Sequence, residues 1–401
     1  MPWRVDTMRF RLVKEVLRRE ESVAAICRRY GVSRKTAYKW LERFELEGRQ
    51  GLGDRKRAPH RQALALDREV EAAVVKLRRR HGWGARKLHR MLQRGALGPR
   101  TPSVSTIETL LKRRGLKSMR ARRHHVPLWR GKFTPADRCN RVWRADYKGY
   151  FFTGDGERIE PLTVTDGRSR YLVSLTCCRS TGEKEARHAF DAAFKRYGLP
   201  DVILTDNGNP FATPSLTGLT RLSVWFIKLG IRHERTAPAS PYQNGGQERF
   251  HRTLREAVVA PAAATRTAQV RRCARFTHEY NEIRPHEALG LDTPASVYRA
   301  STRKLPARLA PPSYPPSAQV RRVRTNGTIK WQGKLLYVGE VLARELLAVQ
   351  VDAVDGKARV HFYDRVLGTI SPRGDKIFLR GEAPPPRGRR LASKLTKSRK
   401  V

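Results

Sequence analysis

Residues 142–176 read VWRADYKGYFFTGDGERIEPLTVTDGRSRYLVSLT, and this stretch decides the fold class. Its runs of β-branched and aromatic residues predict strands at 142–147, 161–165 and 171–176. The residues between the last two strands, Asp166-Gly167-Arg168-Ser169, are typical of a tight turn. Three strands thus follow one another before any helical pattern begins.

Downstream of this stretch, helices and strands alternate. A capping box of Ser180 and Glu183 predicts a helix that runs to Tyr197 and stops at Gly198. Further patterns predict a strand at 202–204, a helix containing Leu219 to Leu229, a strand at 231–235, and a long helix that opens at 241–246 and contains Glu248. Three strands followed by alternating helices and strands predict a mixed α/β sheet.

Three acidic residues of this region occupy informative positions. Asp146 lies at the end of a predicted strand, Asp206 directly follows another, and Glu248 lies near the start of a helix. Strand ends hold the sites of α/β sheets, and three carboxylates suit Mg²⁺ or Mn²⁺. Two such ions would activate an attacking oxygen and stabilise a leaving oxygen on phosphorus. Taken singly, Asp206-Asn207-Gly208 is also typical of a plain turn, and Glu248 of a residue favoured by a helix dipole.

Two further acids compete with these three. Asp166 also ends an apolar strand, but its sequel of Gly167 and Ser169 favours a hairpin turn. Asp155 lies between Gly154 and Gly156 and is interpreted as a turn residue.

The N-terminal region predicts helical DNA-binding units. In residues 1–50, Met8, Leu12, Val13, Val16 and Leu17 share one helix face, Ser22 caps a second helix, and Ser33 caps a third after the Gly31 turn. This order is typical of a helix-turn-helix, and it presents Arg34, Lys35, Thr36 and Lys39 to DNA. A plain helical hairpin with a solvated face is the alternative.

Residues 62–116 predict a second helix-turn-helix or winged unit. One helix carries Leu66, Val70, Val74 and Leu77 on a common face, and Ser105 is expected to cap the last helix before Gly115. Two units in tandem would recognise an extended duplex site. Residues 117–138 form a basic linker that is expected to follow DNA.

The C-terminal region begins after a proline-rich linker at 305–317. Five short strands, at 329–331, 335–338, 348–351, 358–363 and 366–370, predict a small β-barrel within 318–380. Residues 381–401 form a basic tail that is expected to be disordered.

The charge distribution indicates a polyanionic partner. The 401 residues include 83 Lys and Arg against 37 Asp and Glu, a net charge of +46. Residues 1–134 carry a net charge of +24, residues 135–301 carry +7 and residues 302–401 carry +15. This distribution favours phosphate binding by the two flanking regions and a reaction site in the central region. The sequence shows no membrane span or signal peptide, and its five scattered cysteines indicate neither disulfides nor zinc. We therefore expect a cytoplasmic protein that binds nucleic acid.

Several motifs together carry a family resemblance. WRADYKG (143–149), LTDNGNPF (204–211) and SPYQNGGQERFHRTLREAV (240–258) resemble the integrase-core transposases of bacterial insertion sequences, in particular the four-eighty-one clade near the insertion-sequence-three group. YNEIRPHEALGLDTPASVY (280–298) resembles the segment after that core, and GWGARKL (82–88) the second helix-turn-helix. The resemblance implies an RNase H-like catalytic core at 139–301 with an Asp-Asp-Glu triad at Asp146, Asp206 and Glu248.

The resemblance also implies further DNA contacts. Tyr242, Gln243 and Asn244 would contact the strand being cut, and Arg252 and Arg255, on the Glu248 face of the helix, would contact phosphates of the DNA end. Pairing within the helix, between Glu248 and Arg252 and between Arg252 and Glu256, is the alternative. Two departures stand out: 41 residues separate Asp206 from Glu248, more than the family's usual mid-thirties, and the retroviral zinc-binding domain is absent.

The expected function is a metal-dependent transposase that cuts the ends of its element and joins them to target DNA, working as a dimer or higher multimer on DNA. A DNA-binding regulator with an inactive core is the first alternative, and a ribonuclease H-type nuclease is the second.

Overall fold

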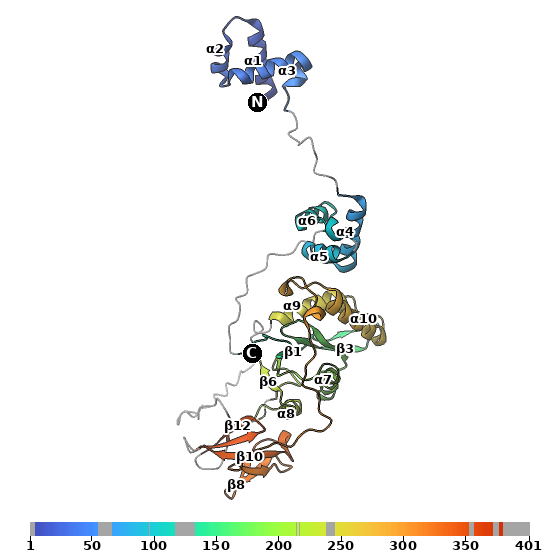
Figure 1. Ribbon diagram of the computed structural model, residues 1–401, viewed down its shortest axis with the longest axis vertical. Coiled ribbons are helices and arrows are strands. Elements are labelled where there is room, and N and C mark those ends of the chain that lie inside the picture. The colour runs from blue at the N-terminus through green and yellow to red at the C-terminus, as the bar shows by residue number, and fades with distance from the viewer. Residues whose placement is uncertain are drawn as a thin grey trace, which may run out of the picture. The chain divides into compact units, whose positions relative to one another are not determined.

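The computed structural model describes residues 5–54, 66–95, 97–116, 133–213, 215, 217–237, 245–352, 357–371 and 377–379. The chain divides into two compact units, Met1–Glu71 and Ala72–Val401. Figure 1 shows the elements of each. Within the described residues, no helix is long and apolar enough to cross a membrane.

The first unit is a three-helix bundle. It comprises α1 (Val5–Arg18), α2 (Val23–Tyr30), α3 (Arg34–Glu47) and the 3₁₀ turn η1 (Gly48–Leu52). Ser22 and Ser33 cap α2 and α3 as predicted, and Gly31 between them has a φ of 65°, which favours glycine. Leu12, Val13 and Val16 are buried in the core, whereas Met8 and Leu17, predicted on the same face, are exposed.

A second helical bundle consists of α4 (Arg68–His81), α5 (Ala85–Arg94), the 3₁₀ turn η2 (Gly98–Arg100) and α6 (Val104–Arg113). Its core contains Leu88 and Ile107, both fully buried. The cap predicted at Ser105 is wrong, because the hydroxyl of Ser103 accepts the hydrogen bond from the backbone N–H of Thr106.

The central sheet has the strand order β4-β3-β1-β5-β6, with the short β2 also paired to β3. Its strands are β1 (Val142–Tyr147), β2 (Phe151–Phe152), β3 (Arg158–Asp166), β4 (Leu172–Cys178), β5 (Val202–Thr205) and β6 (Arg232–Arg235). The first three long strands are antiparallel, while β5 and β6 run parallel to β1. This arrangement is an RNase H-like fold, as the resemblance implied.

Helices cover both faces of this sheet (Figure 1). One face packs against α7 (Glu183–Tyr197) and α8 (Arg221–Lys228), around Trp143, Phe190 and Phe226. The other face packs against α9 (Gly245–Leu254) and α10 (Arg266–His278), around Phe250 and Phe276. Short turns follow these helices: η4 (Arg255–Val259), η5 (Glu279–Ile283), η6 (Glu287–Leu289) and α11 (Pro294–Val297).

The capping box predicted for α7 is wrong. The helix has Gly182 at its N-cap with no side-chain cap, and Glu185 rather than Glu183 accepts hydrogen bonds from the backbone N–H groups of Arg179 and Ser180. Residues 133–138, predicted as linker, belong to the core, because Phe133 and Ala136 pack against the sheet and Thr134 bonds to Glu234.

The C-terminal region is an antiparallel sheet of order β13-β12-β11-β10-β7 with a hairpin, β8-β9. Its strands are β7 (Gln319–Arg322), β8 (Thr328–Trp331), β9 (Lys334–Tyr337), β10 (Leu346–Val351), β11 (Ala358–Phe362), β12 (Arg365–Ile370) and β13 (Ile377–Leu379), with η7 (Glu340–Leu342) between β9 and β10. The five predicted strands are present, and β7 and β13 were not predicted. In the described part, β7 and β13 are unpaired with each other, so the sheet is open rather than a closed barrel.

This region is not separate from the central domain. Leu219, Val224 and Ile227, at and before α8, pack in the same apolar cluster as the C-terminal strands. The Lys228 ammonium lies 2.7 Å from the Glu345 carboxylate across this boundary. Tyr314, in the proline-rich segment, donates its hydroxyl proton to the carbonyl of Leu346.

The second helical bundle is also attached to the core. His81 Nδ1 lies 2.6 Å from a carboxylate oxygen of Glu279, and Ile283 packs against the bundle's apolar cluster. Arg90 and Arg94 both pair with Asp292, at 3.2 and 2.5 Å. These two arginines of α5 are therefore engaged with the core.

Candidate active site

The strand register places Asp146 beside Asp206. In the parallel pair, Val142 lies opposite Val202 and Arg144 opposite Leu204. Two residues further along each strand, the same register brings Asp146 next to Asp206, where β5 ends. The prediction that these acids meet at one edge of the sheet therefore has a direct structural basis.

Asp146 is in an electrostatically unfavourable position. Its side chain is 22% exposed. Burial, followed by the charges of Asp206 and, more weakly, Glu248, raises the pKa of Asp146 to about 7. The three acids are therefore close enough to repel one another, and a cation between them would relieve that repulsion.

A tight turn holds the Asp206 carboxylate. The backbone N–H of Gly208 donates to Asp206 Oδ1 at 3.1 Å. A Cβ atom at position 208 would lie 3.0 Å from Asp206 Oδ2, so any larger residue would crowd the carboxylate. Behind the turn, Thr205 bonds to His233 at 2.9 Å; burial lowers the pKa of His233 to about 3, which keeps the ring neutral.

Glu248 depends on the anchoring of α9. Its helix neighbour Gln247 donates to the Thr163 hydroxyl at 2.7 Å and accepts from Thr165 at 3.0 Å. His251 Nε2 also lies 2.9 Å from the Thr163 hydroxyl, which itself donates to the carbonyl of Asp146 at 2.9 Å. Thr163 thus joins the Glu248 helix to the Asp146 strand.

His251 does not neutralise Asp146. Its Nδ1 lies 3.8 Å from Asp146 Oδ2. Burial, helped by the charge of Lys148, lowers the pKa of His251 to about 4. A neutral imidazole leaves the carboxylate charge for another partner. Gln247, His251 and Thr163 were missed from the sequence, although the first two lie in the QERFH segment that carries Glu248.

The donor set fits a hard divalent cation, because it consists of carboxylate oxygens that repel one another. In the described ranges, no three His, Cys, Asp or Glu side chains are gathered closely enough to hold an ion. Glu248 is exposed on its helix, so the ligands approach one another without forming a closed cage.

The predicted DNA-contact residues have different surroundings. Arg34, Lys35 and Lys39 are exposed on α3, whereas the Thr36 hydroxyl lies 2.9 Å from that of Ser33. Arg252 and Arg255 are exposed and form no ion pair within the described part, so the predicted alternative of pairing with Glu248 is absent there. Tyr242, Gln243 and Asn244 lie outside the described residues.

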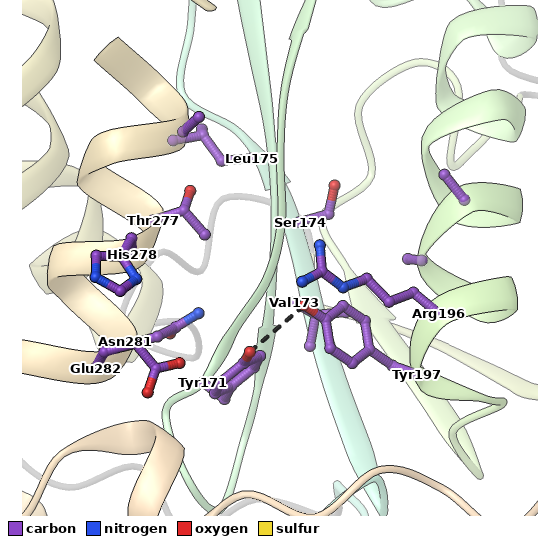
Figure 2. A pocket seen from close by; sticks show the side chains of 13 residues that line it. Tyr171, Val173, Ser174, Leu175, Arg196, Tyr197, Thr277, His278, Asn281 and Glu282 are labelled. Carbon is purple, nitrogen blue, oxygen red and sulfur yellow. Dashed lines mark hydrogen bonds between the residues drawn. The ribbon is translucent and has the colours of Figure 1, made fainter. Parts of the chain in front are cut away.

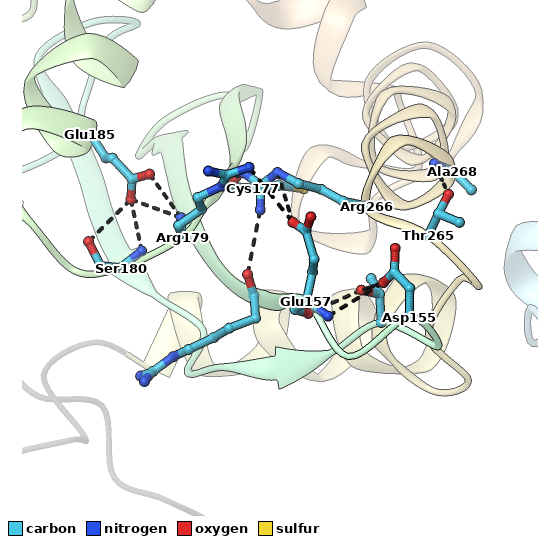
Figure 3. A network of polar contacts seen from close by, with 11 residues as sticks. Asp155, Glu157, Cys177, Arg179, Ser180, Glu185, Thr265, Arg266 and Ala268 are labelled. Atoms are coloured by element: carbon cyan, nitrogen blue, oxygen red, sulfur yellow. Dashed lines mark hydrogen bonds and ion pairs between the residues drawn. The ribbon is translucent and has the colours of Figure 1, made fainter.

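The rival acids are structural. Asp166 is fully buried, and its carboxylate accepts hydrogen bonds from the N–H of Asn140 and from the N–H and hydroxyl of Ser169. Asp155 accepts from the Thr153 hydroxyl and, at 3.4 Å, from the N–H of Glu157. Figure 3 shows this exposed network, in which Arg266 also donates to the carbonyl of Cys177. Both turn interpretations are confirmed.

Figure 2 shows a pocket between β4, α7 and α10. Its lining includes Ser174, Arg196 and His278, and the hydroxyls of Tyr171 and Tyr197 lie 3.4 Å apart in it. None of the three converging acids lines it. Asp146 and Asp206 instead lie at the ends of β1 and β5.

Comparisons with known proteins agree with this geometry. Residues 136–241 and 229–294 each match an integrase core domain, residues 8–60 a helix-turn-helix domain and residues 36–111 a homeodomain-like domain. The chain is 29% identical over 251 residues to an uncharacterized 39.2 kDa protein of insertion element IS476 from Xanthomonas euvesicatoria, covering 61% of this chain and 69% of that protein.

Two other matches cover the central region. The InsD transposase of insertion element IS2D from Escherichia coli K12 is 29% identical over 170 residues, covering 40% of this chain and 54% of that protein. The HTLV-2 integrase catalytic core domain, solved in complex with magnesium, aligns with a TM-score of 0.32 and 15% identity, covering 41% of this chain and 99% of that one.

Proposed function

Because the chain belongs to the integrase-core transposases of bacterial insertion sequences, we propose that it binds the terminal inverted repeats of its element and catalyses DNA strand cleavage and strand transfer. The observation that carries this proposal is the convergence of Asp146, Asp206 and Glu248 at one end of the sheet, where burial and the charges of Asp206 and Glu248 raise the pKa of Asp146. Such a site suits phosphoryl transfer, in which positioning and charge stabilisation provide most of the catalysis.

Asp146, Asp206 and Glu248 would hold Mg²⁺ or Mn²⁺, two ions per site. When bound, such ions activate an attacking oxygen and stabilise the leaving oxygen on phosphorus. Other residues of the chain position the three acids. Gln247 and Thr163 fix the helix that carries Glu248, and Gly208 holds the Asp206 carboxylate toward the site.

The first helical unit would recognise the element end. Arg34, Lys35 and Lys39 are exposed near the start of α3, with the Ser33 cap fixing that end of the helix. Replacing all three with Ala should weaken end binding at least tenfold. It should also reduce the salt dependence of binding, because a protein that contacts fewer phosphates releases fewer counterions from the DNA. Fluorescence anisotropy at several salt concentrations measures both effects. Unchanged affinity would exclude α3 as the reading helix.

Catalysis is tested by substituting the acids singly. We expect cleavage of an end duplex in Mg²⁺ to be abolished by each of three substitutions, Asp146→Asn, Asp206→Asn and Glu248→Gln. Binding to the end should persist, because the residues assigned to it lie in the first helical unit. The matched control is Asp155→Asn, which changes an exposed turn acid and should cleave normally. If all three variants retained cleavage, the triad would be refuted, and binding without cleavage by the wild-type chain would favour the DNA-binding regulator instead.

Assembly follows from the reaction. Joining two element ends to one target requires two active sites held together, so the working form should be at least a dimer on DNA. A net charge of +46 opposes association until phosphates neutralise it, and bound DNA would place the protein at the bacterial chromosome in the cytoplasm. Light scattering should show monomer or weak dimer alone and a multimer with end DNA. Cleavage and joining of both ends by one protomer would refute this.

A further inference from the structure

Arg144 lies on the same face of β1 as Asp146, because side chains alternate along a strand. Its cross-strand partner is Thr165, to which Gln247 of α9 bonds. The side chain is half-buried, and its Nε atom is buried without a hydrogen-bond partner. An arginine therefore lies under α9, two residues from a catalytic acid, with part of its guanidinium unsatisfied.

Arg170 brings a second guanidinium to the same place. It follows the turn after β3 with a φ of 62°, an unusual backbone conformation for a residue other than glycine. A Cβ atom at Gly246 would lie 3.1 Å from Arg170 Nη1 and 3.4 Å from Arg144 Nη1. Both guanidinium groups thus meet at the first turn of α9, two residues before Glu248.

This pair of cations has no counter-ion among the residues that the structure describes. Within the described part, neither guanidinium donates a hydrogen bond or forms an ion pair. Residues 237–246, which lead into α9, read APASPYQNGG and contain no acid. Two partly desolvated like charges without a partner are costly in a folded protein. The arrangement is complete only when an anion joins it.

We propose that Arg144 and Arg170 form a binding site for a backbone phosphate of the DNA strand, next to the phosphate that is cut. The inference rests on the proposed function, since the site adjoins the carboxylates assigned to cleavage. The fork of a guanidinium group matches the oxygens of a phosphate group. The exposed Arg252 and Arg255 would hold DNA generally, whereas this recessed pair fixes the strand relative to Asp146.

Cleavage by the full chain tests the site. The substrate is a duplex carrying the boundary sequence that flanks this gene in its genome. Arg144→Gln and Arg170→Gln should each lower the cleavage rate at saturating DNA about tenfold, and the double variant about a hundredfold, the range of charge-assisted hydrogen bonds. Overall affinity should change less than threefold, because many other cations hold the DNA.

The matched control is Arg168→Gln, the same charge change two residues away on an exposed side chain. It should cleave at the wild-type rate; an equal loss for Arg168→Gln and Arg170→Gln would show a general charge effect and overturn the site. A second arm replaces single phosphates near the cut with neutral methylphosphonates. At one position, a methylphosphonate should lower the cleavage rate of the wild-type chain about tenfold, yet it should not lower the cleavage rate of the double variant any further. Additive losses at every position would overturn the proposal.

A third arm needs no catalysis and separates this inference from the proposed function. In DNA-free protein, Arg144→Gln should raise the melting temperature, because it removes a repelling charge that has no partner. Inorganic phosphate should then stabilise the wild-type chain more than the double variant. A lower melting temperature for Arg144→Gln, or equal phosphate effects, would identify a structural or adventitious role. If the wild-type chain cleaved no DNA, the proposed function would fail, and this arm would still decide whether the pair binds phosphate.

Discussion

Each end of the β1–β3 ladder carries an aspartate, fully buried at Asp166 and partly buried at Asp146, and the two differ in how the carboxylate is satisfied. Asp166 lies opposite Trp143 at one end and accepts three hydrogen bonds from Asn140 and Ser169. Asp146 lies opposite Thr163 at the other end and faces the like charges of Asp206 and Glu248. A carboxylate that the fold fully satisfies stabilises the fold, whereas one that faces like charges is available for a ligand.

The largest effect on stability is expected when Asp166, whose carboxylate has its hydrogen-bond partners, is substituted. Asp166→Ala should destabilise the second unit by roughly 3 kcal/mol or more, because it leaves buried donors on Asn140 and Ser169 without an acceptor. Urea unfolding followed by Trp fluorescence measures the change. Loss of less than 1 kcal/mol would remove the contrast between the two ends.

A change in stability of the opposite sign is expected when Asp146 is substituted. In EDTA, Asp146→Asn should stabilise the protein at pH 8, on the order of 2 kcal/mol. The raised pKa of Asp146, about 7, means that the native state retains a proton that the unfolded chain releases near 3.8. The contribution of Asp146 to the stability of the wild-type protein is therefore greatest below pH 4, and it is lost as the pH rises through 7. The advantage of Asn should vanish below pH 4; an advantage that is constant with pH would contradict this account.

A smaller effect concerns the turn that holds Asp206. Gly208→Ala places a Cβ atom 3.0 Å from Asp206 Oδ2 and should displace the carboxylate. We expect cleavage to fall about tenfold with little change in the melting temperature, since a 1 Å misplacement is costly in catalysis. Gly84→Ala, at an exposed position with a φ of −74° and open space around the Cβ position, is a control for the loss of glycine. Equal cleavage by both variants would exclude a positioning role for Gly208.

The smallest effects compare one hydroxyl at each end. Ser169→Ala and Thr163→Val each remove hydroxyl bonds to their aspartate residue, at 2.6 and 2.9 Å, and each should cost about 1 kcal/mol of stability. Only Thr163→Val should also lower cleavage, because Thr163 joins β1 to the Glu248 helix. Equal losses of cleavage in the two variants would show that activity merely follows stability.

Local patterns predicted most helices and strands, whereas the triad was assigned from the family resemblance and stays a prediction. Asp206 directly follows an apolar run and Asp146 ends another, so their strands could be placed from the sequence, and parallel register then brought them together. The caps at Ser22 and Ser33 were also local signals. Ser103 and Gly182 were missed because a neighbouring Ser offered an equally good pattern.

Long-range contacts had no such signal. Nothing around Asp292 indicates that Arg90 and Arg94 pair with it, about two hundred positions away in the chain. For the same reason, the meeting of Arg144 and Arg170 became visible only when strand, turn and α9 were assembled. The strand β7, with the sequence QVRR, lacks the apolar alternation that predicts a strand and is defined by its pairing with β10.

The two faces of α8 have a consequence for damaged copies of the gene. Trp225 and Phe226 pack into the catalytic core, while Val224 and Ile227 pack under the C-terminal strands. A premature stop near codon 305 would leave Val224 and Ile227 facing water and remove the ion pair of Lys228. We therefore expect such truncated copies to yield an aggregating product and not a competing catalytic fragment. Decayed elements would then fall silent without interfering with intact copies in the same genome.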